Sequence, residues 1–472
     1  MDHCPRLGLS LKFQELKLSE NLNKIISDIG YSELTPIQEK SIPVLLQGKD
    51  VLGKSKTGSG KTAAFAIPIL EKIDLQLFDV QALVLCPTRE LAQQVITEFR
   101  KLGRLMPGLQ VLGVTGGQPG REQSESLRRG VHIVVGTPGR VLDLLGRGRF
   151  YTEEIRTVVL DEADEMLDMG FEEDIRKIVN ETPVNRQTVF FSATYPEKIL
   201  NLSKQYQNKP VMIEIVEENI SNSTAKIEQF VYFVEKENKV DILLRVLQQH
   251  PSESTIVFCN TKLAIAEIAD RLNEVGANFC FLQGDLEQKE RERVMAMFRN
   301  HSYQILVATD IAARGLDIKD LDLVINYDLP NQNEVYVHRI GRTGRAGKNG
   351  VAVTIVDQVQ RLDITDIENV TKVPMIHQKL GFENQLGLNK NLKESKMNTI
   401  FIEAGRKQKL RPGDILGALT GDIGLKSEHV GKIEVLDHQS YVAIKAEFAQ
   451  IAFQKLRDGR IKAQKFYVKL LT

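Results

Sequence analysis

The sequence has no excess of charge of either sign and no long apolar run. Its 472 residues carry 62 basic and 62 acidic side chains, so the overall charge favours no class of partner. It lacks any apolar stretch of about 18 residues, and its first residues show no basic segment followed by an apolar one. We therefore expect a cytoplasmic protein that is neither exported nor membrane-spanning.

Cysteine is scarce and scattered. The chain has four, Cys4, Cys86, Cys259 and Cys280, without the spacing of metal ligands. Cys86 and Cys259 stand at the ends of apolar runs, where buried free thiols are common. We expect a reduced protein without a disulfide framework.

Charge is distributed unevenly along the chain. Residues 398–472 hold 13 Lys and Arg against 8 Asp and Glu, an excess of five positive charges that the preceding residues balance. A basic end on a mildly acidic body indicates an anionic partner such as nucleic acid. The length predicts two or three domains, and 42% hydrophobic with 26% charged residues is typical of a globular protein.

Short β-rich runs alternate with helical patterns in two sets. The first set covers residues 50–52, 82–85, 133–135, 157–160 and 188–191, and the second 255–258, 278–282, 304–307, 323–325 and 351–356. Runs that are apolar on both faces predict strands buried between helix layers, and their alternation with helices predicts parallel sheets. We therefore expect an α/β protein with two tandem doubly wound domains.

The C-terminal segment follows another order. Strands are predicted at 399–404, 432–436, 441–445 and 466–471, and helices at 412–419 and 446–456. This β-α-β-β-α-β order is the split ferredoxin-like pattern of RNA-recognition domains. The predicted organisation is domain 1 at 1–213, a linker at 214–228, domain 2 at 229–383, a linker at 384–397 and a small α+β RRM-like domain at 398–472.

A glycine-rich loop follows the first predicted strand and precedes a helix. Its glycines would let backbone N–H groups surround a phosphate at the helix N-terminus, and its lysine would reach the β- and γ-phosphates. The alternative, a structural turn, is less consistent with a strand before and a helix after the loop. The candidate ATP-binding residues are Thr57, Gly58, Ser59, Gly60, Lys61 and Thr62.

A run of carboxylates follows the fourth predicted strand. Asp161, with the hydroxyl of Thr62, would hold Mg²⁺, and Glu162 would activate water. Alone, the run Asp161, Glu162, Ala163 and Asp164 could be a solvated turn. Together with the phosphate loop in the same predicted sheet, it indicates a nucleoside triphosphatase.

These four residues spell the signature of the DEAD-box RNA helicases, and the chain resembles that family over about residues 13–373. The resemblance implies two RecA-like domains, ATP and Mg²⁺ as cofactors and RNA as the partner. Gly30, Tyr31 and the run 35–38 look like the adenine-reading element of the family. In that role Gln38 would hydrogen-bond the adenine edge and Phe13 would stack on its face.

The resemblance also implies RNA contacts to backbone phosphates and sugars rather than to bases. Helix capping or a simple turn is the alternative for several of these positions. The implied RNA-binding residues are Thr88, Arg89, Gly116, Gly117, Thr137, Pro138, Gly139 and Arg140 in domain 1, and Gly284, Thr309 and Arg314 in domain 2.

Further residues of the family pattern would join hydrolysis to RNA binding. Arg342 and Arg345 would act as arginine fingers on the transferring phosphoryl group, in a catalytic set with Lys61, Asp161 and Glu162. Gly315 and Asp317 would approach the nucleotide from the same side. The implied coupling residues are Asp164, Ser192, Thr194 and His338, with Arg339 a further candidate. As in the family, ATP and RNA would bind cooperatively to a closed state that separates a few base pairs.

The segment 398–471 resembles the C-terminal RNA-binding domain of the DbpA helicases. The resemblance rests on the runs 405–407, 411–424 and 431–433, and it implies recognition of a hairpin in 23S ribosomal RNA during large-subunit assembly. Its candidate RNA-binding residues are Arg406, Lys407, Lys409 and Arg411. The other possibility for base recognition is stacking on Tyr441 and Phe401, although the usual aromatic signature is poor.

Three alternatives remain at this stage. The chain could be a DNA translocase of the same superfamily, although Gln38 and Phe13 argue against it. It could bind RNA without catalysis, although every predicted catalytic group is present. It could also be a general RNA helicase without specificity for ribosomal RNA, its basic domain adding only nonspecific affinity.

Overall fold

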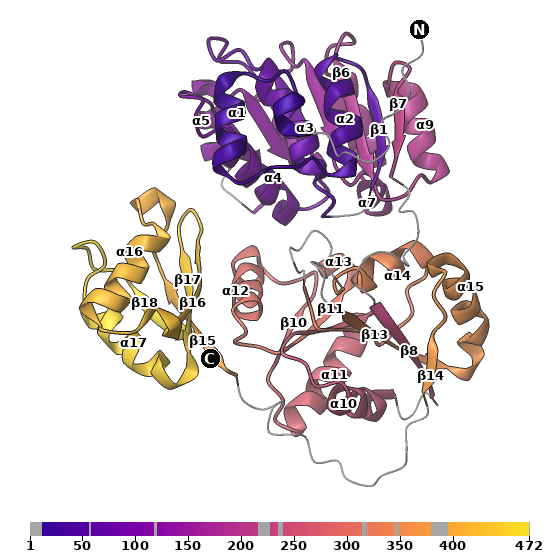
Figure 1. Cartoon of the computed structure of the whole chain (residues 1–472), viewed down its shortest axis with the longest axis vertical. Coiled ribbons are helices and arrows are strands. Elements are labelled where there is room, and N and C mark those ends of the chain that lie inside the picture. The colour runs from indigo at the N-terminus through magenta and orange to yellow at the C-terminus, as the bar shows by residue number, and fades with distance from the viewer. Residues whose placement is uncertain are drawn as a thin grey trace. The chain divides into compact units, whose positions relative to one another are not determined.

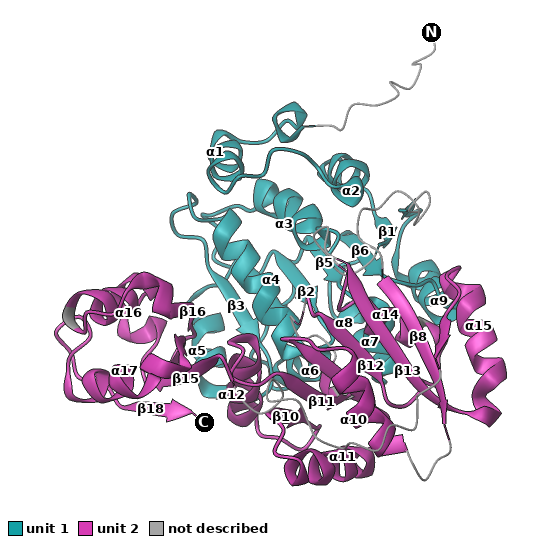
Figure 2. Ribbon diagram, turned by 60° about the horizontal axis from the view of Figure 1, so that its bottom comes forward, with its two compact units in different colours: residues 1–218, 315–317 teal, residues 219–314, 318–472 magenta. Residues whose placement is uncertain are grey.

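The computed structural model describes residues 12–55, 58–117, 120–215, 227–234, 239–313, 318, 320–344, 349–378 and 395–471 (Figure 1). The described residues fall into two compact units, the first within residues 12–215 and the second within residues 227–471 (Figure 2). No helix in these ranges is long and apolar enough to span a membrane.

The first unit contains a sheet of seven strands in the order β3-β4-β2-β5-β6-β1-β7. All neighbouring strands pair in parallel. The strands are β1 (Val51–Lys54), β2 (Ala82–Leu85), β3 (Val111–Val114), β4 (Ile133–Gly136), β5 (Thr157–Leu160), β6 (Gln187–Ser192) and β7 (Val211–Glu214). The five predicted strands are confirmed. The two that were missed, β3 and β7, lie at the sheet edges, where half-exposed strands lack a doubly buried apolar run.

Helices cover both faces of this sheet. Successive strand residues point to opposite faces, so Val189 of β6 joins one core and Phe190 joins the other. The first core packs against α1 (Glu20–Asp28), α2 (Pro36–Leu46), α3 (Lys61–Lys72) and α4 (Arg89–Leu102). The second packs against α6 (Pro138–Gly146), α7 (Ala163–Asp168), α8 (Glu172–Asn180) and α9 (Glu197–Tyr206), with α5 (Gly120–Arg129) beside α6. A short 3₁₀ turn, η1 (Phe13–Glu15), precedes α1.

The second unit begins with another parallel sheet of seven strands, in the order β10-β11-β9-β12-β13-β8-β14. Its strands are β8 (Ile227–Val234), β9 (Thr255–Cys259), β10 (Phe279–Leu282), β11 (Ile305–Thr309), β12 (Leu323–Asn326), β13 (Gly350–Asp357) and β14 (Ile376–Gln378). Its helices are α10 (Lys239–Gln249), α11 (Lys262–Glu274), α12 (Gln288–Arg299), α13 (Asp310–Ala313), α14 (Asn333–Ile340) and α15 (Arg361–Thr371). The five predicted strands are present. β8 and β14 were not predicted, and β8 begins inside the range 214–228 that the sequence suggested as a linker.

The C-terminal part of the second unit has the predicted β-α-β-β-α-β order. It consists of β15 (Met397–Ile402), α16 (Pro412–Gly417), β16 (Val430–Val435), β17 (Ser440–Lys445), α17 (Ala446–Asp458) and β18 (Val468–Leu471). The antiparallel sheet has the order β16-β17-β15-β18. The two predicted RecA-like sheets and the small α+β domain are therefore confirmed.

The sheet of this small domain packs against α12 of the preceding α/β domain. Ala296 and Met297 of α12 form a buried cluster with Tyr441 and Leu471, and Phe401 packs at its edge. Tyr441 is only 1% exposed. Apolar burial of this kind stabilises the docked arrangement.

Polar pairs surround that apolar contact. The Thr399 hydroxyl lies 2.8 Å from the Ser302 hydroxyl and accepts a hydrogen bond from the Asn300 amide at 3.1 Å. Arg299 donates through Nη2 to both carboxylate oxygens of Glu434, at 2.8 and 2.9 Å. These bonds satisfy groups that docking removes from water, so the contact has a defined geometry.

Candidate nucleotide and RNA site

The phosphate loop joins β1 to α3 through glycines that no other residue could replace without strain. Gly58 has φ 85° and Gly60 has φ 94°, both in the left-handed region. A Cβ on Gly60 would also lie 2.5 Å from Nε2 of Gln38. This turn exposes the N-terminus of α3, where backbone N–H groups favour an anion. Thr57 lies outside the described residues, and Thr62 is half-buried in the first turn of α3.

The loop also holds the predicted phosphate-binding lysine. Lys61 is 5% exposed, and its Nζ donates to the carbonyl oxygen of Ser55 at 3.1 Å. The Ser55 hydroxyl donates to the Ser59 hydroxyl at 2.6 Å across the base of the loop. The ammonium group is thus held under the loop, beside the end of α3 that attracts anions.

The predicted acidic group lies at the end of β5 and is almost wholly buried. Asp161 and Glu162 are 2% and 5% exposed. Burial raises the pKa of Asp161, an effect that the charge of nearby Lys61 opposes and that of Glu162 adds to. Oδ1 of Asp161 has no hydrogen-bond partner among the described residues. Glu162 has φ 53°, an uncommon conformation for a residue with a side chain and one found at functional sites.

The third carboxylate of the group ties β5 to the loop after β6. Oδ2 of Asp164 accepts from the backbone N–H groups of Ala193 and Thr194, at 3.1 and 2.9 Å. It also accepts from the Thr194 hydroxyl at 2.9 Å. The Ser192 hydroxyl instead donates to the Thr194 carbonyl at 2.6 Å. A displacement of the acidic group would therefore move the predicted coupling loop directly.

The predicted adenine-reading residues lie beside the phosphate loop. Oε1 of Gln38 accepts from the Thr35 N–H at 3.0 Å, and its Nε2 donates to the Gly60 carbonyl at 3.1 Å. Phe13 is 2% exposed and stacks on Tyr31, with ring centroids 5.9 Å apart. The structure therefore brings Gln38 and Gly60 together, although they are far apart in sequence.

The predicted RNA-binding residues of this unit follow β2, β3 and β4 at the same carboxyl edge. Thr88 caps α4 by accepting from the Leu91 N–H at 3.2 Å, so the capping alternative holds for its hydroxyl. The Arg89 guanidinium lies over Gly116, where a Cβ would meet it at 2.7 Å. Close approach thus requires glycine here and joins two motifs that are distant in sequence. Gly117 adopts φ 76°.

The third motif of this edge begins α6. Pro138 occupies the first turn after the N-cap Thr137, and Gly139 is exposed. The Arg140 guanidinium is engaged within the protein: Nη1 donates to Asp143 at 2.8 Å and Nε to Gln123 at 2.9 Å. It therefore holds α5 against α6.

In the second unit, the sequence missed a buried polar cluster around Arg339. This side chain is 2% exposed and donates to both carboxylate oxygens of Asp310, at 2.7 and 2.6 Å. It also reaches Asn260, Asn326 and the Asp328 carbonyl, and thus connects the ends of β9, β11 and β12. The signal was available, because Arg339 shares a helical face with buried Tyr336 and Ile340.

The structure describes four other predicted residues of this unit. Thr309 ends β11, His338 lies on α14 and Arg342 follows α14. Gly284 has open space where a side chain would stand. Arg314, Gly315, Asp317 and Arg345 lie outside the described residues.

Comparison with known proteins agrees with this geometry. The DEAD/DEAH box helicase family matches residues 35–202, the helicase conserved C-terminal domain residues 238–347 and the DbpA RNA binding domain residues 399–470. The ATP-dependent RNA helicase DbpA of Escherichia coli is 45% identical over 448 residues, 94% of this chain and 96% of its own. The chain belongs to the DEAD-box ATP-dependent RNA helicases.

Two further matches each cover a smaller share of this chain. The helicase CshA of Geobacillus kaustophilus is 46% identical over 78% of both chains. The structure of Saccharomyces cerevisiae Dbp5 bound to RNA and ADP BeF3 has a TM-score of 0.70 and 30% identity, and it covers 78% of this chain and 95% of that one. As a member of this family, the helicase is an RNA-dependent ATPase with a DbpA-type RNA-binding domain.

Within the RNA-binding domain of the helicase, the basic loop is exposed, whereas Tyr441 is buried and Phe401 is half-buried. Arg406, Lys407, Lys409 and Arg411 all face solvent in and beside a 3₁₀ turn. A Cβ on Gly405 would lie 2.2 Å from the Leu436 carbonyl, so close backbone packing fixes the start of this loop. Of the two aromatic candidates for base recognition, Tyr441 is buried against α12 and Phe401 packs at the edge of the same cluster.

Proposed function

We propose that this helicase couples ATP hydrolysis to local unwinding of RNA, and that its C-terminal domain directs it to a hairpin of 23S ribosomal RNA during large-subunit assembly. Such a role places it in the cytoplasm. The observation that supports the targeting proposal is the exposed basic loop 406–411 on a domain whose Tyr441 is buried against α12.

In the first unit, Lys61 would bind the β- and γ-phosphates of ATP and Glu162 would accept a proton from the attacking water. Asp161 and Thr62 would hold Mg²⁺, which screens the phosphate charge when bound. The buried Oδ1 of Asp161, without a partner among the described residues, supports this assignment, because Mg²⁺ prefers such oxygen ligands. Gln38 beside Gly60 supports the placement of adenine next to the phosphate loop.

In the second unit, Arg342 and Arg345 would neutralise charge on the transferring phosphoryl group, with Gly315 and Asp317 approaching the nucleotide. Asp164, through Thr194, would transmit the state of the ATP site to the coupling loop, and His338 would receive it. ATP and RNA would then favour the same closed state and bind cooperatively.

The C-terminal domain would recognise its RNA through the loop rather than by stacking. Four cations on an exposed loop can bind phosphates and the edges of guanine bases. Lys462, whose Nζ donates to the Lys409 carbonyl at 3.2 Å, adds charge beside the loop. Tyr441 could stack on a base only after the domain left α12.

The decisive experiment measures ATPase activity with a large-subunit rRNA hairpin fragment, with poly(A) and with DNA, at equal nucleotide concentration. We expect selective stimulation by the rRNA fragment that Arg406→Glu with Arg411→Glu abolishes. Lys426→Glu reverses another exposed charge of the same domain, outside the loop, and should preserve this stimulation. Glu162→Gln should remove hydrolysis and retain RNA binding.

Other outcomes separate the alternatives. Equal stimulation by every RNA would leave a general RNA helicase and refute the rRNA target. Stimulation by DNA would indicate a translocase, and binding of RNA without any turnover would indicate a non-catalytic clamp.

A further inference from the structure

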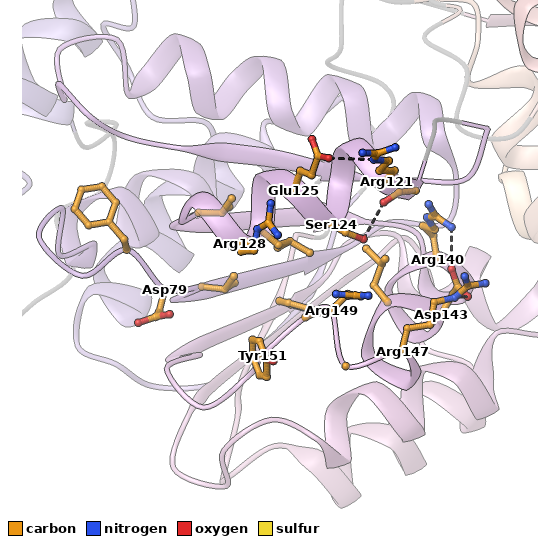
Figure 3. Close-up of a pocket in the computed structure, with 18 residues that line it drawn as sticks. Asp79, Arg121, Ser124, Glu125, Arg128, Arg140, Asp143, Arg147, Arg149 and Tyr151 are labelled. Atoms are coloured by element: carbon orange, nitrogen blue, oxygen red, sulfur yellow. Dashed lines mark hydrogen bonds and ion pairs between the residues drawn. The ribbon is translucent and has the colours of Figure 1, made fainter.

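A groove of about 980 Å³ runs along the flank of the first unit between α5 and α6 (Figure 3). One end lies at the start of both helices, beside Gly120, Arg121 and Arg140. The other end lies beyond the helices, beside Phe78 and Tyr151. Since α5 has 10 residues, the groove extends roughly 15 Å. None of the predicted site residues except Arg140 lines it.

The groove has an excess of positive charge. Five arginines and three carboxylates line it. Arg121 pairs with Glu125 at 3.2 Å, while Arg140 and Arg147 share one carboxylate, Asp143, at 2.8 and 2.6 Å. An anion entering the groove therefore meets more cations than their carboxylate partners neutralise.

The two remaining arginines are free to bind an external anion. Arg128 and Arg149 are exposed, and neither has an ion pair in the part of the chain that the structure describes. In Figure 3 Arg149 lies between Arg140 and the side chain of Tyr151, and Arg128 lies farther from Arg140 than Arg149 does. Positive charge thus continues along the groove instead of gathering at one point.

Exposed aromatic rings lie at the far end of the groove. Tyr151 is 70% exposed and Phe78 is 56% exposed. Both rings are therefore open to contact with a bound molecule. Cations that follow a backbone, together with aromatic rings on which bases stack, are the two features of a single-stranded nucleic-acid path. An acidic polypeptide would use the cations and leave the rings uncovered, so the combination favours RNA.

The near end of the groove is continuous with the predicted RNA-binding edge. Arg140 closes the motif 137–140, and Gly120 and Arg121 come shortly after Gly117. We propose that RNA leaving these loops continues into the groove, with phosphates on Arg128 and Arg149 and bases stacked on Tyr151 and Phe78. This inference rests on the proposed RNA path over domain 1, and it makes the groove a second segment of the RNA site.

The test compares charge reversals at adjacent positions of one helix. Arg128 and Arg129 are both exposed in the last turn of α5, but only Arg128 lines the groove. Arg128→Glu and Arg129→Glu therefore change the net charge and the helix-end electrostatics equally. RNA affinity of the full-length chain is measured with non-hydrolysable ATP analogue, for RNAs lengthened one nucleotide at a time at both ends in separate series.

For the unchanged protein, RNA affinity should first level off at the length that fills the core site. It should then rise a second time as the RNA is lengthened further at one of its two ends. Arg128→Glu and Arg149→Glu should each remove this second rise, on the order of a tenfold loss, with a shallower salt dependence. Tyr151→Ala should weaken binding of the long RNA to a similar extent without changing the salt dependence of that binding. Arg129→Glu should retain the second rise, and short RNAs should bind all four variants alike.

Three results would overturn the inference. The first is an equal loss of RNA affinity in Arg128→Glu and Arg129→Glu, and the second is the absence of a second rise in the unchanged protein. The third is that Arg128→Glu abolishes binding of polyglutamate, measured in parallel, and leaves RNA affinity intact. The last would assign the groove to an acidic polypeptide. RNA-stimulated ATPase with short RNA, measured in parallel, reports on the proposed function separately, so its absence is distinguishable from failure of the groove.

Discussion

Replacement of Arg339 should destabilise the second α/β domain far more than replacement of an ordinary surface arginine. Arg339→Ala leaves Asp310 without the guanidinium that now donates to both its carboxylate oxygens. It also removes the donors that reach Asn260, Asn326 and the Asp328 carbonyl. The effect should therefore be on stability first and on coupling only as a consequence.

The magnitude follows from burial. Removal of one partner from a buried ion pair costs about 3–5 kcal/mol, because the other charge stays desolvated. The Arg339 side chain is 2% exposed and that of Asp310 is 22% exposed, so water can partly solvate the remaining carboxylate. This relief is offset by the neutral acceptors left unsatisfied, at about 1 kcal/mol each. We expect a loss of about 3–5 kcal/mol, or roughly 6–20 °C in the melting temperature of the domain.

Hydrogen exchange read by mass spectrometry is the suitable assay, because the chain has several domains and a single global transition would mix them. Protection should fall in β9, β11 and β12 and stay unchanged in the sheet of the first unit. Arg361→Ala, at an exposed arginine of the same unit whose guanidinium lies 5.9 Å from the centroid of the Phe233 ring, should change stability by no more than about 1 kcal/mol.

A second pair of variants separates a structural role from a coupling role. Arg339→Met with Asp310→Asn removes both charges and should recover part of the stability lost in Arg339→Ala. An Arg339→Ala protein with normal protection in β9, β11 and β12 but reduced unwinding would refute this reasoning. It would return Arg339 to the coupling role suggested by its sequence.

Two further outcomes are expected. Arg299→Ala should weaken docking of the RNA-binding domain by about 1–3 kcal/mol, because Glu434 loses its charged donor. Energy transfer between dyes on the two domains would report the weaker docking, and an unchanged signal would contradict this expectation. Gly60→Ala should lower ATP affinity at least tenfold, because a left-handed φ of 94° admits no side chain without strain. Gly146→Ala, where a Cβ meets nothing within 4 Å, is the matched control, and equal titration curves for the two variants would refute the argument.

The sequence predicted the strands that are buried on both faces and missed β3, β7, β8 and β14, all of which contain partly or wholly exposed residues. Ala82–Leu85 is apolar throughout because helices cover both sides of β2, and such a run can be recognised from the sequence alone. β14 is three exposed residues, and only its pairing with β8 makes it a strand. Edge strands depend on a neighbour that can be far away in the chain, so their own residues carry little signal.

In the candidate ATP site, too, some features are predicted by local sequence and others depend on the fold. Local spacing places Gly58, Gly60 and Lys61 on one loop, and no tertiary information is needed to see it. The contact of Gln38 with Gly60 and the bonds from Asp164 to the loop after β6 join distant segments. The sequence supplied these residues through a family resemblance, whereas the pairing itself comes from the fold.

By itself, the sequence determined the order of the domains, the class of chemistry and the two candidate means of base recognition in the C-terminal domain. Tertiary structure decided which side of that domain is exposed, because only packing against α12 covers Tyr441 and leaves the loop 406–411 in solvent. It also gathered Arg128, Arg149 and Tyr151 into one groove. Local patterns record what a residue can do, but which side chains share a surface depends on contacts between segments that the chain brings together only when it folds.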